Sequence, residues 1–160
     1  MIVVLMGVAG SGKTTIGVRL ARAEGWPFFD ADDFHTPENK EKMRRGEGLT
    51  DADREPWLAA LRARIDEFRA AGRSAVFACS ALKQAYRDRL QAGPDVRFVY
   101  LKGMFELIER RLASRPGHYA GPSLLRSQFA ALEEPVGIPV VDVDQAPDEM
   151  LQATRRVLGL

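Results

Sequence analysis

The chain has 160 residues, of which 46% are hydrophobic and 28% are charged, an ordinary composition for one compact domain. Its 23 Lys and Arg residues nearly balance its 22 Asp and Glu residues, which argues against nucleic acid or a membrane surface as a partner. One cysteine cannot form an internal disulfide, and with two histidines it gives no run at the spacing of a zinc site. We therefore expect a single domain over residues 1–160 in a reducing cytoplasm.

Short β-rich runs alternate with longer helical patterns along the chain. The runs cover residues 2–6, 27–30, 74–79, 97–101 and 139–143. They lack the alternation of a half-exposed strand, which predicts parallel strands covered by helices on both faces of a sheet. The sequence therefore predicts an α/β fold of three layers with a five-stranded parallel sheet.

Apolar residues at helical spacing predict helices between these strands. The expected helical segments are 13–23, the face from Trp57 to Phe68, 81–90, 105–112 and 124–132. We expect Pro56 near the first turn of the second helix and Ser80 as the cap of the third. Residues 114–123 hold two prolines and two glycines and break the pattern, which indicates a short lid.

A glycine-rich motif follows the first expected strand, where the chain reads Gly7-Val8-Ala9-Gly10-Ser11-Gly12-Lys13-Thr14. This pattern, between a strand and a helix, is typical of a phosphate-binding loop, whose glycines let backbone N–H groups approach phosphate oxygens. Lys13 is expected to reach the β- and γ-phosphates, and the Thr14 hydroxyl to join the shell of a Mg²⁺ ion. The motif, extended to Thr15, predicts a site for ATP with Mg²⁺.

Two carboxylates follow the second expected strand, at Asp30 and Asp32. A spacing of two along an extended segment points both side chains to one side. We expect Asp30 to hold the metal's water shell, and Asp32 to orient an acceptor hydroxyl and take its proton. The alternative is that these acids only cap the following helix and solvate a loop. The third run ends without a carboxylate, which argues against a hydrolytic ATPase.

Together with further segments, these residues resemble the gluconokinases, small ATP-dependent sugar-acid kinases whose phosphate-loop fold is related to shikimate and adenylate kinases. The matching segments are residues 5–14, 30–32 with His35, 39–43, 46–51, 53–58, 79–83, 86–88, 100–103, 117–119, 127–129 and 132–135. The resemblance implies transfer of the γ-phosphoryl group of ATP to the 6-hydroxyl of D-gluconate, giving 6-phosphogluconate and ADP. Pro116 and Tyr119-Ala120 depart from the family pattern, and this bears on the lid more than on the chemistry.

A sugar acid needs a cation for its carboxylate and hydrogen-bonding groups for its hydroxyls. Within the matching segments, Arg54 and Arg87 are the expected carboxylate anchors, because a guanidinium binds a carboxylate through two hydrogen bonds. Lys83 is expected to add a point charge. His35 and His118 are expected to hydrogen-bond substrate hydroxyls, and the alternative for a loop histidine is a bond to the backbone alone.

Arginines near the lid are candidates for the transferring phosphate. Arg115 lies in the lid and Arg111 one helical turn before it, so both are expected to point the same way and stabilise the developing charge. Lid closure would also exclude water and limit wasteful hydrolysis of ATP. Gln145 and Pro147 follow the last strand, where related kinases hold the adenine.

Two other functions remain open at this point. One is a kinase for another small acceptor, such as shikimate or a nucleoside monophosphate, and the other is a nucleotide-binding module that has lost catalysis. Fold alone does not decide between them. A homodimer is expected slightly ahead of a monomer, because two-fold dimers are the commonest soluble assemblies.

Overall fold

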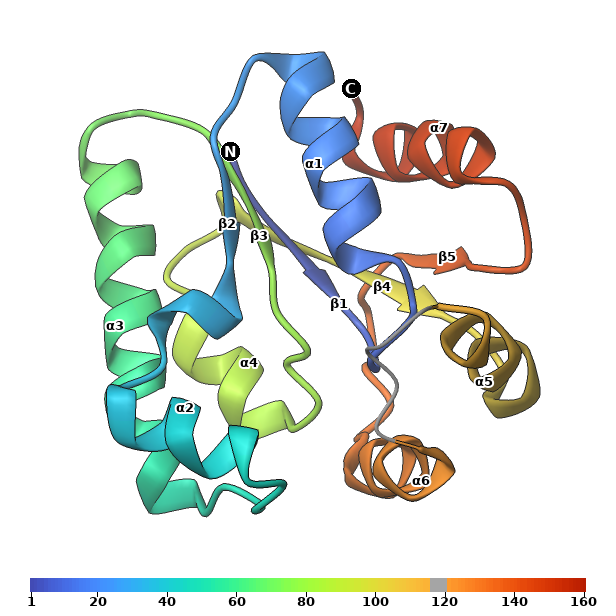
Figure 1. Ribbon diagram of the computed structural model, residues 1–160. Coiled ribbons are helices and arrows are strands. Elements are labelled where there is room, and N and C mark those ends of the chain that lie inside the picture. The colour runs from blue at the N-terminus through green and yellow to red at the C-terminus, as the bar shows by residue number, and fades with distance from the viewer. Residues whose placement is uncertain (116–120) are drawn as a thin grey trace.

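A sheet of five parallel strands forms the centre of the computed structural model, which describes residues 1–115 and 121–160 (Figure 1). The strands are β1 (Ile2–Met6), β2 (Phe28–Asp30), β3 (Ala75–Ala78), β4 (Val96–Lys102) and β5 (Val140–Asp142). Their order is β2-β3-β1-β4-β5, and the central strand β1 pairs in parallel with both β3 and β4. The predicted parallel sheet is confirmed.

Helices cover both faces of this sheet. One face carries α3 (Asp51–Ala70) and α4 (Gln84–Leu90), and the other carries α1 (Lys13–Glu24), α5 (Phe105–Ala113) and α7 (Pro147–Leu158). Successive residues of β1 divide between the two cores, so that Val4 packs on the α3 side and Val3 on the α1 side. All of β1 is buried, which is why its apolar run shows no alternation.

The remaining helices lie beyond the carboxyl ends of the strands, at the lower end of Figure 1. A 3₁₀ turn, η1 (Ala31–Phe34), follows β2 directly, then α2 (Pro37–Arg44) and, much later in the chain, α6 (Pro122–Ala131). Ligands bind at this end of an open parallel sheet, so these elements surround the expected site. None of the helices in the described ranges has the length and apolar character that a bilayer crossing requires.

The start of α3 differs from the prediction. The helix begins at Asp51, so that Pro56 lies in its second turn rather than near its first. Thr50 caps the helix, because its hydroxyl accepts a hydrogen bond from the Asp53 N–H at 3.0 Å while the Asp53 carboxylate accepts one from the Thr50 N–H at 3.0 Å. The first residues of α3 are polar and add nothing to the apolar periodicity, so the sequence pattern placed the start of the helix too far along the chain.

The start of α4 was also predicted wrongly. The helix begins at Gln84, its N-cap is Lys83, and Ser80 does not cap it. Ala81 has a φ of 45°, a left-handed conformation that ends any continuous helix at that position. Pro122, near the far end of the predicted lid, is the first residue of α6. Residues 116–120, including the predicted substrate contact His118, lie outside the described residues.

Candidate active site

The phosphate loop joins β1 to α1, and its glycines are required by its shape. Gly7, Gly10 and Gly12 have φ values of 152°, 79° and 98°. A Cβ on Gly7 would stand 2.7 Å from the Leu101 carbonyl oxygen, and one on Gly10 would stand 2.6 Å from Leu112 Cγ. The loop is therefore a tight cradle that only glycine permits at these positions. It opens at the N-terminus of α1, where free N–H groups attract phosphate.

Two further features of this loop fit a bound phosphate chain. The Ser11 hydroxyl is buried and has no hydrogen-bond partner among the described residues. Lys13 Nζ donates to the carbonyl oxygens of Gly7 and Val8, each at 2.9 Å, so the ammonium is folded over the loop. Burial lowers the pKa of Lys13 to about 8, although the negative charges of Asp32 and Asp30 oppose this shift. The ammonium therefore stays largely protonated at neutral pH.

A small cavity of about 80 Å³ lies against the loop. It is lined by Gly10, Gly12, Lys13, Thr14, Thr15 and Arg115. The positive charge of Arg115 also depresses the pKa of Lys13, so the two cations share one site. The structure thus brings together the predicted lysine, threonines and lid arginine at the place where the phosphates would lie.

The other predicted nucleotide contacts lie farther along the edge of the sheet. Arg111 Nη1 donates to the Val143 carbonyl oxygen at 2.5 Å, just after β5. Gln145 Nε2 donates to the Asp142 carbonyl oxygen at 2.7 Å, and Pro147 is the first residue of α7. These bonds hold the loop between β5 and α7 in shape. In this structure, Arg111 points to that loop rather than in the direction of Arg115.

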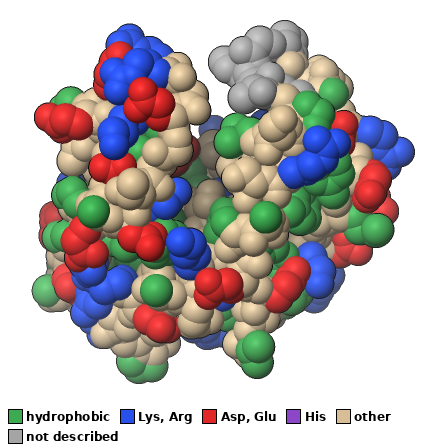
Figure 2. All heavy atoms as spheres, turned by 90° about the horizontal axis from the view of Figure 1, so that it is seen from below, with side chains coloured by type: hydrophobic (Ala, Val, Ile, Leu, Met, Phe, Trp, Pro, Cys, Tyr) green, Lys and Arg blue, Asp and Glu red, His purple; other side chains and the backbone are tan. Residues whose placement is uncertain are grey.

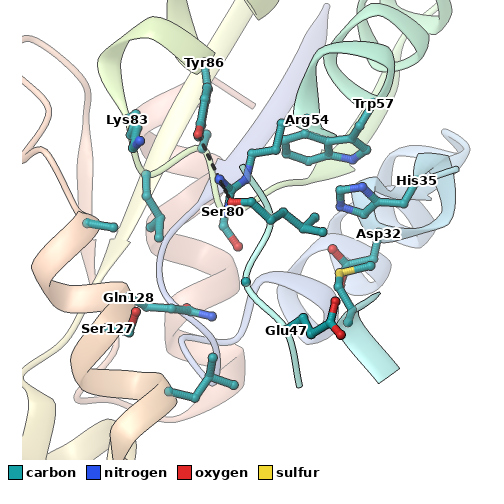
Figure 3. A pocket seen from close by; sticks show the side chains of 17 residues that line it. Asp32, His35, Glu47, Arg54, Trp57, Ser80, Lys83, Tyr86, Ser127 and Gln128 are labelled. Atoms are coloured by element: carbon teal, nitrogen blue, oxygen red, sulfur yellow. Dashed lines mark hydrogen bonds between the residues drawn. The ribbon is translucent and has the colours of Figure 1, made fainter. Parts of the chain in front are cut away.

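A larger cavity of about 370 Å³ opens beside the phosphate loop. Figure 2 shows the surface hollowed at this end of the molecule. In Figure 3 Asp32, His35 and Trp57 approach from one side and Ser127 and Gln128 from the opposite side. Asp32, His35, Arg54 and Lys83, four of the predicted acceptor residues, all line it. We call it the acceptor cavity below.

Asp30 is the last residue of β2, and Asp32 lies in the turn that follows. The two carboxylates are therefore not on one extended segment, as the sequence suggested. Asp32 belongs to η1, and Asp30 caps that turn by accepting a hydrogen bond from the Asp32 N–H at 3.0 Å. The alternative capping role is therefore real for Asp30. Burial raises the pKa of Asp32, the neighbouring charge of Asp30 raises it further, and Lys13 lowers it. The Asp32 carboxylate thus lines the acceptor cavity and also interacts electrostatically with Lys13 of the phosphate loop.

His35 is held flat against Trp57, with ring centroids 4.7 Å apart and an interplanar angle of 11°. Burial lowers the pKa of His35 to about 4, and the nearby cations Arg54 and Lys40 add to the shift. Asn39 Nδ2 donates to the Asp53 carbonyl oxygen at 2.6 Å and lies 3.4 Å from His35 Nδ1. An amide nitrogen can only donate, so Nδ1 accepts and Nε2 carries the proton. A neutral histidine with a donor Nε2 results.

Asn39 and Trp57 were not predicted as site residues. Trp57 resembled a core residue, and it is indeed buried, yet its indole also lines the acceptor cavity and donates to the Ala31 carbonyl oxygen at 2.7 Å. Asn39 is 3% exposed and lies in the first turn of α2, four residues after His35, which precedes that helix in extended conformation. The contact between them depends on this change of backbone conformation, so it has no simple sequence signal.

The two cations of the acceptor cavity are joined by a tyrosine and an acid. Arg54 Nη1 donates to the Tyr86 hydroxyl at 3.2 Å and to the Leu49 carbonyl oxygen at 2.8 Å. The Tyr86 hydroxyl donates to Asp51 Oδ1 at 2.7 Å, and Lys83 Nζ donates to the same oxygen at 3.3 Å. This network holds the charged side chains of Arg54 and Lys83 in place on the wall of the acceptor cavity. Tyr86 was missed because a lone tyrosine carries no motif.

Arg87 requires a correction, because it does not line the acceptor cavity. Its side chain is only 2% exposed, and its guanidinium donates to the carbonyl oxygens of Ala81, Leu82 and Glu133 at 2.7, 3.0 and 2.8 Å. Burial also lowers the pKa of Arg87. The residue braces the strained loop before α4, and of the three predicted cations only Arg54 and Lys83 line the acceptor cavity.

The two residues predicted to bind a metal, Thr14 and Asp30, suit an ion that arrives with a nucleotide. Among residues 1–115 and 121–160, no three His, Cys, Asp or Glu side chains form a cluster that could hold a metal. Thr14 is exposed in the first turn of α1, and Asp30 keeps one carboxylate oxygen outside its capping bond. Mg²⁺ commonly takes one or two protein ligands and completes its shell with phosphates and water. These two side chains fit that requirement.

A phosphate loop that opens onto an acceptor cavity with its own carboxylate defines a phosphate-loop kinase of small molecules. In agreement with this class, the family model described as shikimate kinase matches residues 9–135. The chain is 41% identical to the thermoresistant gluconokinase of Escherichia coli (strain K12), over 98% of this chain and 93% of that protein. The chain belongs to the gluconokinase family.

Solved structures agree with this assignment. A gluconokinase from Sinorhizobium meliloti 1021 superimposes with a TM-score of 0.89 at 41% identity, covering 98% of this chain and 90% of that chain. An unliganded sugar kinase from Janibacter sp. HTCC2649 superimposes with a TM-score of 0.90 at 44% identity, covering 99% and 94%. The predicted family and fold are therefore confirmed.

Proposed function

We propose that the protein transfers the γ-phosphoryl group of ATP to the 6-hydroxyl of D-gluconate, which yields 6-phosphogluconate and ADP. The observation that carries this proposal is the acceptor cavity beside the phosphate loop, where Asp32 lines the cavity and interacts electrostatically with Lys13. Membership of the gluconokinase family supports gluconate as the acceptor. Shikimate and inactive-module alternatives receive no comparable support.

The nucleotide half of the site would hold ATP by its phosphates. The loop from Gly7 to Thr15 would surround them, with donors from the backbone N–H groups at the start of α1, and Thr14 and Asp30 would hold the accompanying Mg²⁺. When bound, Mg²⁺ neutralises phosphate charge during the transfer. Lys13 and Arg115 would stabilise the charge on the transferring group. Arg111, Gln145 and Pro147 are proposed to shape the adenine end.

The acceptor half would hold gluconate by its carboxylate and hydroxyls. Arg54 and Lys83 would bind the carboxylate, and the Nε2–H of His35 would donate to a hydroxyl oxygen. Asp32 would take the proton of the 6-hydroxyl as the bond from that oxygen to the γ-phosphorus forms. The bond from the γ-phosphorus to the β-phosphate oxygen breaks, and ADP leaves with the electron pair.

Acceptor-dependent consumption of ATP tests this proposal. The purified protein with Mg²⁺ and ATP is assayed with D-gluconate, with shikimate and without an acceptor, and Lys13→Ala serves as the blank. We expect turnover with gluconate alone, lost in the variant. Binding of ATP without phosphorylation of gluconate would contradict the kinase assignment. Cytoplasmic location, a homodimer and the lid over residues 114–123 stay predictions.

A further inference from the structure

Gln128 on α6 joins the phosphate loop to the acceptor cavity. Its Oε1 accepts a hydrogen bond from the Ala9 N–H at 2.7 Å, between residues 119 positions apart in the chain. The same side chain lines the acceptor cavity. No role for this residue follows from the site described so far, although it touches both halves of that site.

The bond to Ala9 fixes which way the amide of Gln128 faces. A backbone N–H can only donate, so the amide oxygen must point to the loop and the amide nitrogen must point elsewhere. In Figure 3 the side chain extends from α6 with the nitrogen at the end that reaches toward the cavity. None of the other residues that line the cavity accepts a hydrogen bond from this nitrogen in Figure 3. Two N–H donors therefore face the space that an acceptor would fill.

The helix that carries Gln128 is firmly seated. Leu125 is 1% exposed in the core, and Phe129 packs edge-on against Phe105 with ring centroids 5.7 Å apart. Beyond the helix, the Glu133 N–H donates to the Leu82 carbonyl oxygen at 2.8 Å. The amide of Gln128 is thus positioned before a ligand arrives, which reduces the entropy cost of a contact with that ligand.

We propose that Gln128 determines acceptor specificity by donating from Nε2 to a hydroxyl oxygen at the reacting end of the sugar acid. This inference rests on the proposed function. The reacting hydroxyl must approach the phosphate loop, where Ala9 lies, whereas the carboxylate goes to Arg54 and Lys83 on another wall of the cavity. The oxygen within reach of Gln128 is therefore that of the 4- or 5-hydroxyl of gluconate.

Steady-state kinetics with gluconate and its 4-deoxy and 5-deoxy analogues test the inference. Gln128→Met keeps the side-chain volume and removes both hydrogen bonds, whereas Gln128→Ala removes them by truncating the side chain. Ser123→Ala is the matched control, because Ser123 is exposed on the same helix and does not line the acceptor cavity. We expect KM for gluconate to rise about tenfold in Gln128→Met, with KM for ATP within about twofold of the wild type.

The deoxy analogues provide a readout that a structural role would not change. In the wild type and in Ser123→Ala, one of the two analogues should bind about tenfold more weakly than gluconate, and this penalty should vanish in both Gln128 variants. Gln128→Ala gives this ratio even if Gln128→Met does not fold. Persistence of the penalty in either folded Gln128 variant would overturn the inference and leave the proposed function standing. Failure of the wild type to phosphorylate gluconate would overturn both.

Discussion

At the scale of single residues, the proposed chemistry depends on Asp32 and its electrostatic surroundings. Asp32→Asn keeps the shape of the side chain and removes the base, so we expect kcat to fall about 10²–10⁴-fold while ATP affinity stays nearly unchanged. The exposed neighbour Asp33 gives the matched control Asp33→Asn, which should retain activity. Comparable kcat values in Asp32→Asn and the wild type would remove Asp32 from its proposed role.

The pKa of Asp32 also predicts how the rate depends on pH. Because burial raises this pKa above that of an ordinary aspartate, the base takes up a proton at a higher pH than a free carboxyl would. The rate with saturating substrates should therefore decline on the acidic side before ordinary carboxylates titrate. A pH–rate profile checks this, and an acidic limb at or below the usual range of aspartate would contradict it.

His35 makes a second prediction at this scale, since its neutral form is the one that the fold favours. Its pKa of about 4 lies below the ordinary value of 6.5, so the unfolded chain binds the proton more readily than the folded protein. The contribution of His35 to the free energy of unfolding is therefore complete above pH 6.5 and is lost as the pH falls toward about 4. Nitrogen NMR should show Nδ1 unprotonated and Nε2 protonated across this range.

Substitution of Asn39 tests whether its side-chain amide determines the tautomer of His35. In Asn39→Ala the donor to His35 Nδ1 is gone, so we expect the two tautomers to mix and the NMR shifts of the two ring nitrogens to approach each other. Lys40→Ala removes an adjacent charge without touching this bond and is the control. An unchanged nitrogen spectrum in Asn39→Ala would show that Asn39 does not determine which ring nitrogen of His35 carries the proton.

At the scale of elements, Arg87 links α4 to the strained loop before it and to the end of α6. Arg87→Met removes the donor to the carbonyl oxygens of Ala81 and Glu133 and one of the two donors to that of Leu82, so urea unfolding should show a loss of about 2–4 kcal/mol. The exposed ion pair of Arg89 with Glu55 provides the control Arg89→Met, which should cost less than about 1 kcal/mol. A variant that kept full stability but lost gluconate binding would restore Arg87 as a carboxylate anchor.

The sequence predicted the elements that are buried and apolar, and it missed those that are polar and depend on local hydrogen bonds. The strands β1 and β3 are buried on both faces, so their apolar runs follow directly from their position in the sheet. The segments η1 and α2 are mostly polar and owe their shape to local bonds, such as the cap in which Thr36 Oγ1 accepts from the Asn39 N–H at 3.1 Å. The left-handed conformation of Ala81, which delays α4, has no sequence signature.

The site shows the same division between what a motif reveals and what packing decides. The phosphate loop and Asp32 could be found because their chemistry requires particular residue types at fixed spacing. Arg87 could not be distinguished from Arg54 in this way, because both are arginines in matching segments and only the fold buries one of them. The contact of Gln128 with the phosphate loop depends on how α6 packs in the fold, so the sequence did not predict it.

At the scale of the whole molecule, the fold brings distant segments to one end of the parallel sheet. The phosphate loop follows β1, the acidic turn follows β2, and the loop bearing Lys83 follows β3, while α6 closes the cavity from the opposite side (Figure 1). These three strand ends therefore each contribute one part of the proposed two-substrate site. Reaction between ATP and an acceptor depends on this convergence, because phosphoryl transfer is mainly a matter of positioning and charge.

The position of the phosphoryl group on the product tests this account most directly. The reaction of ATP, Mg²⁺ and D-gluconate is followed by ³¹P NMR with coupling to protons, with Lys13→Ala as the blank. We predict a single new phosphomonoester whose phosphorus couples to the two protons on C6, formed together with ADP and absent in the variant. A phosphomonoester coupled to another position, or release of inorganic phosphate without a phosphorylated acid, would contradict the account.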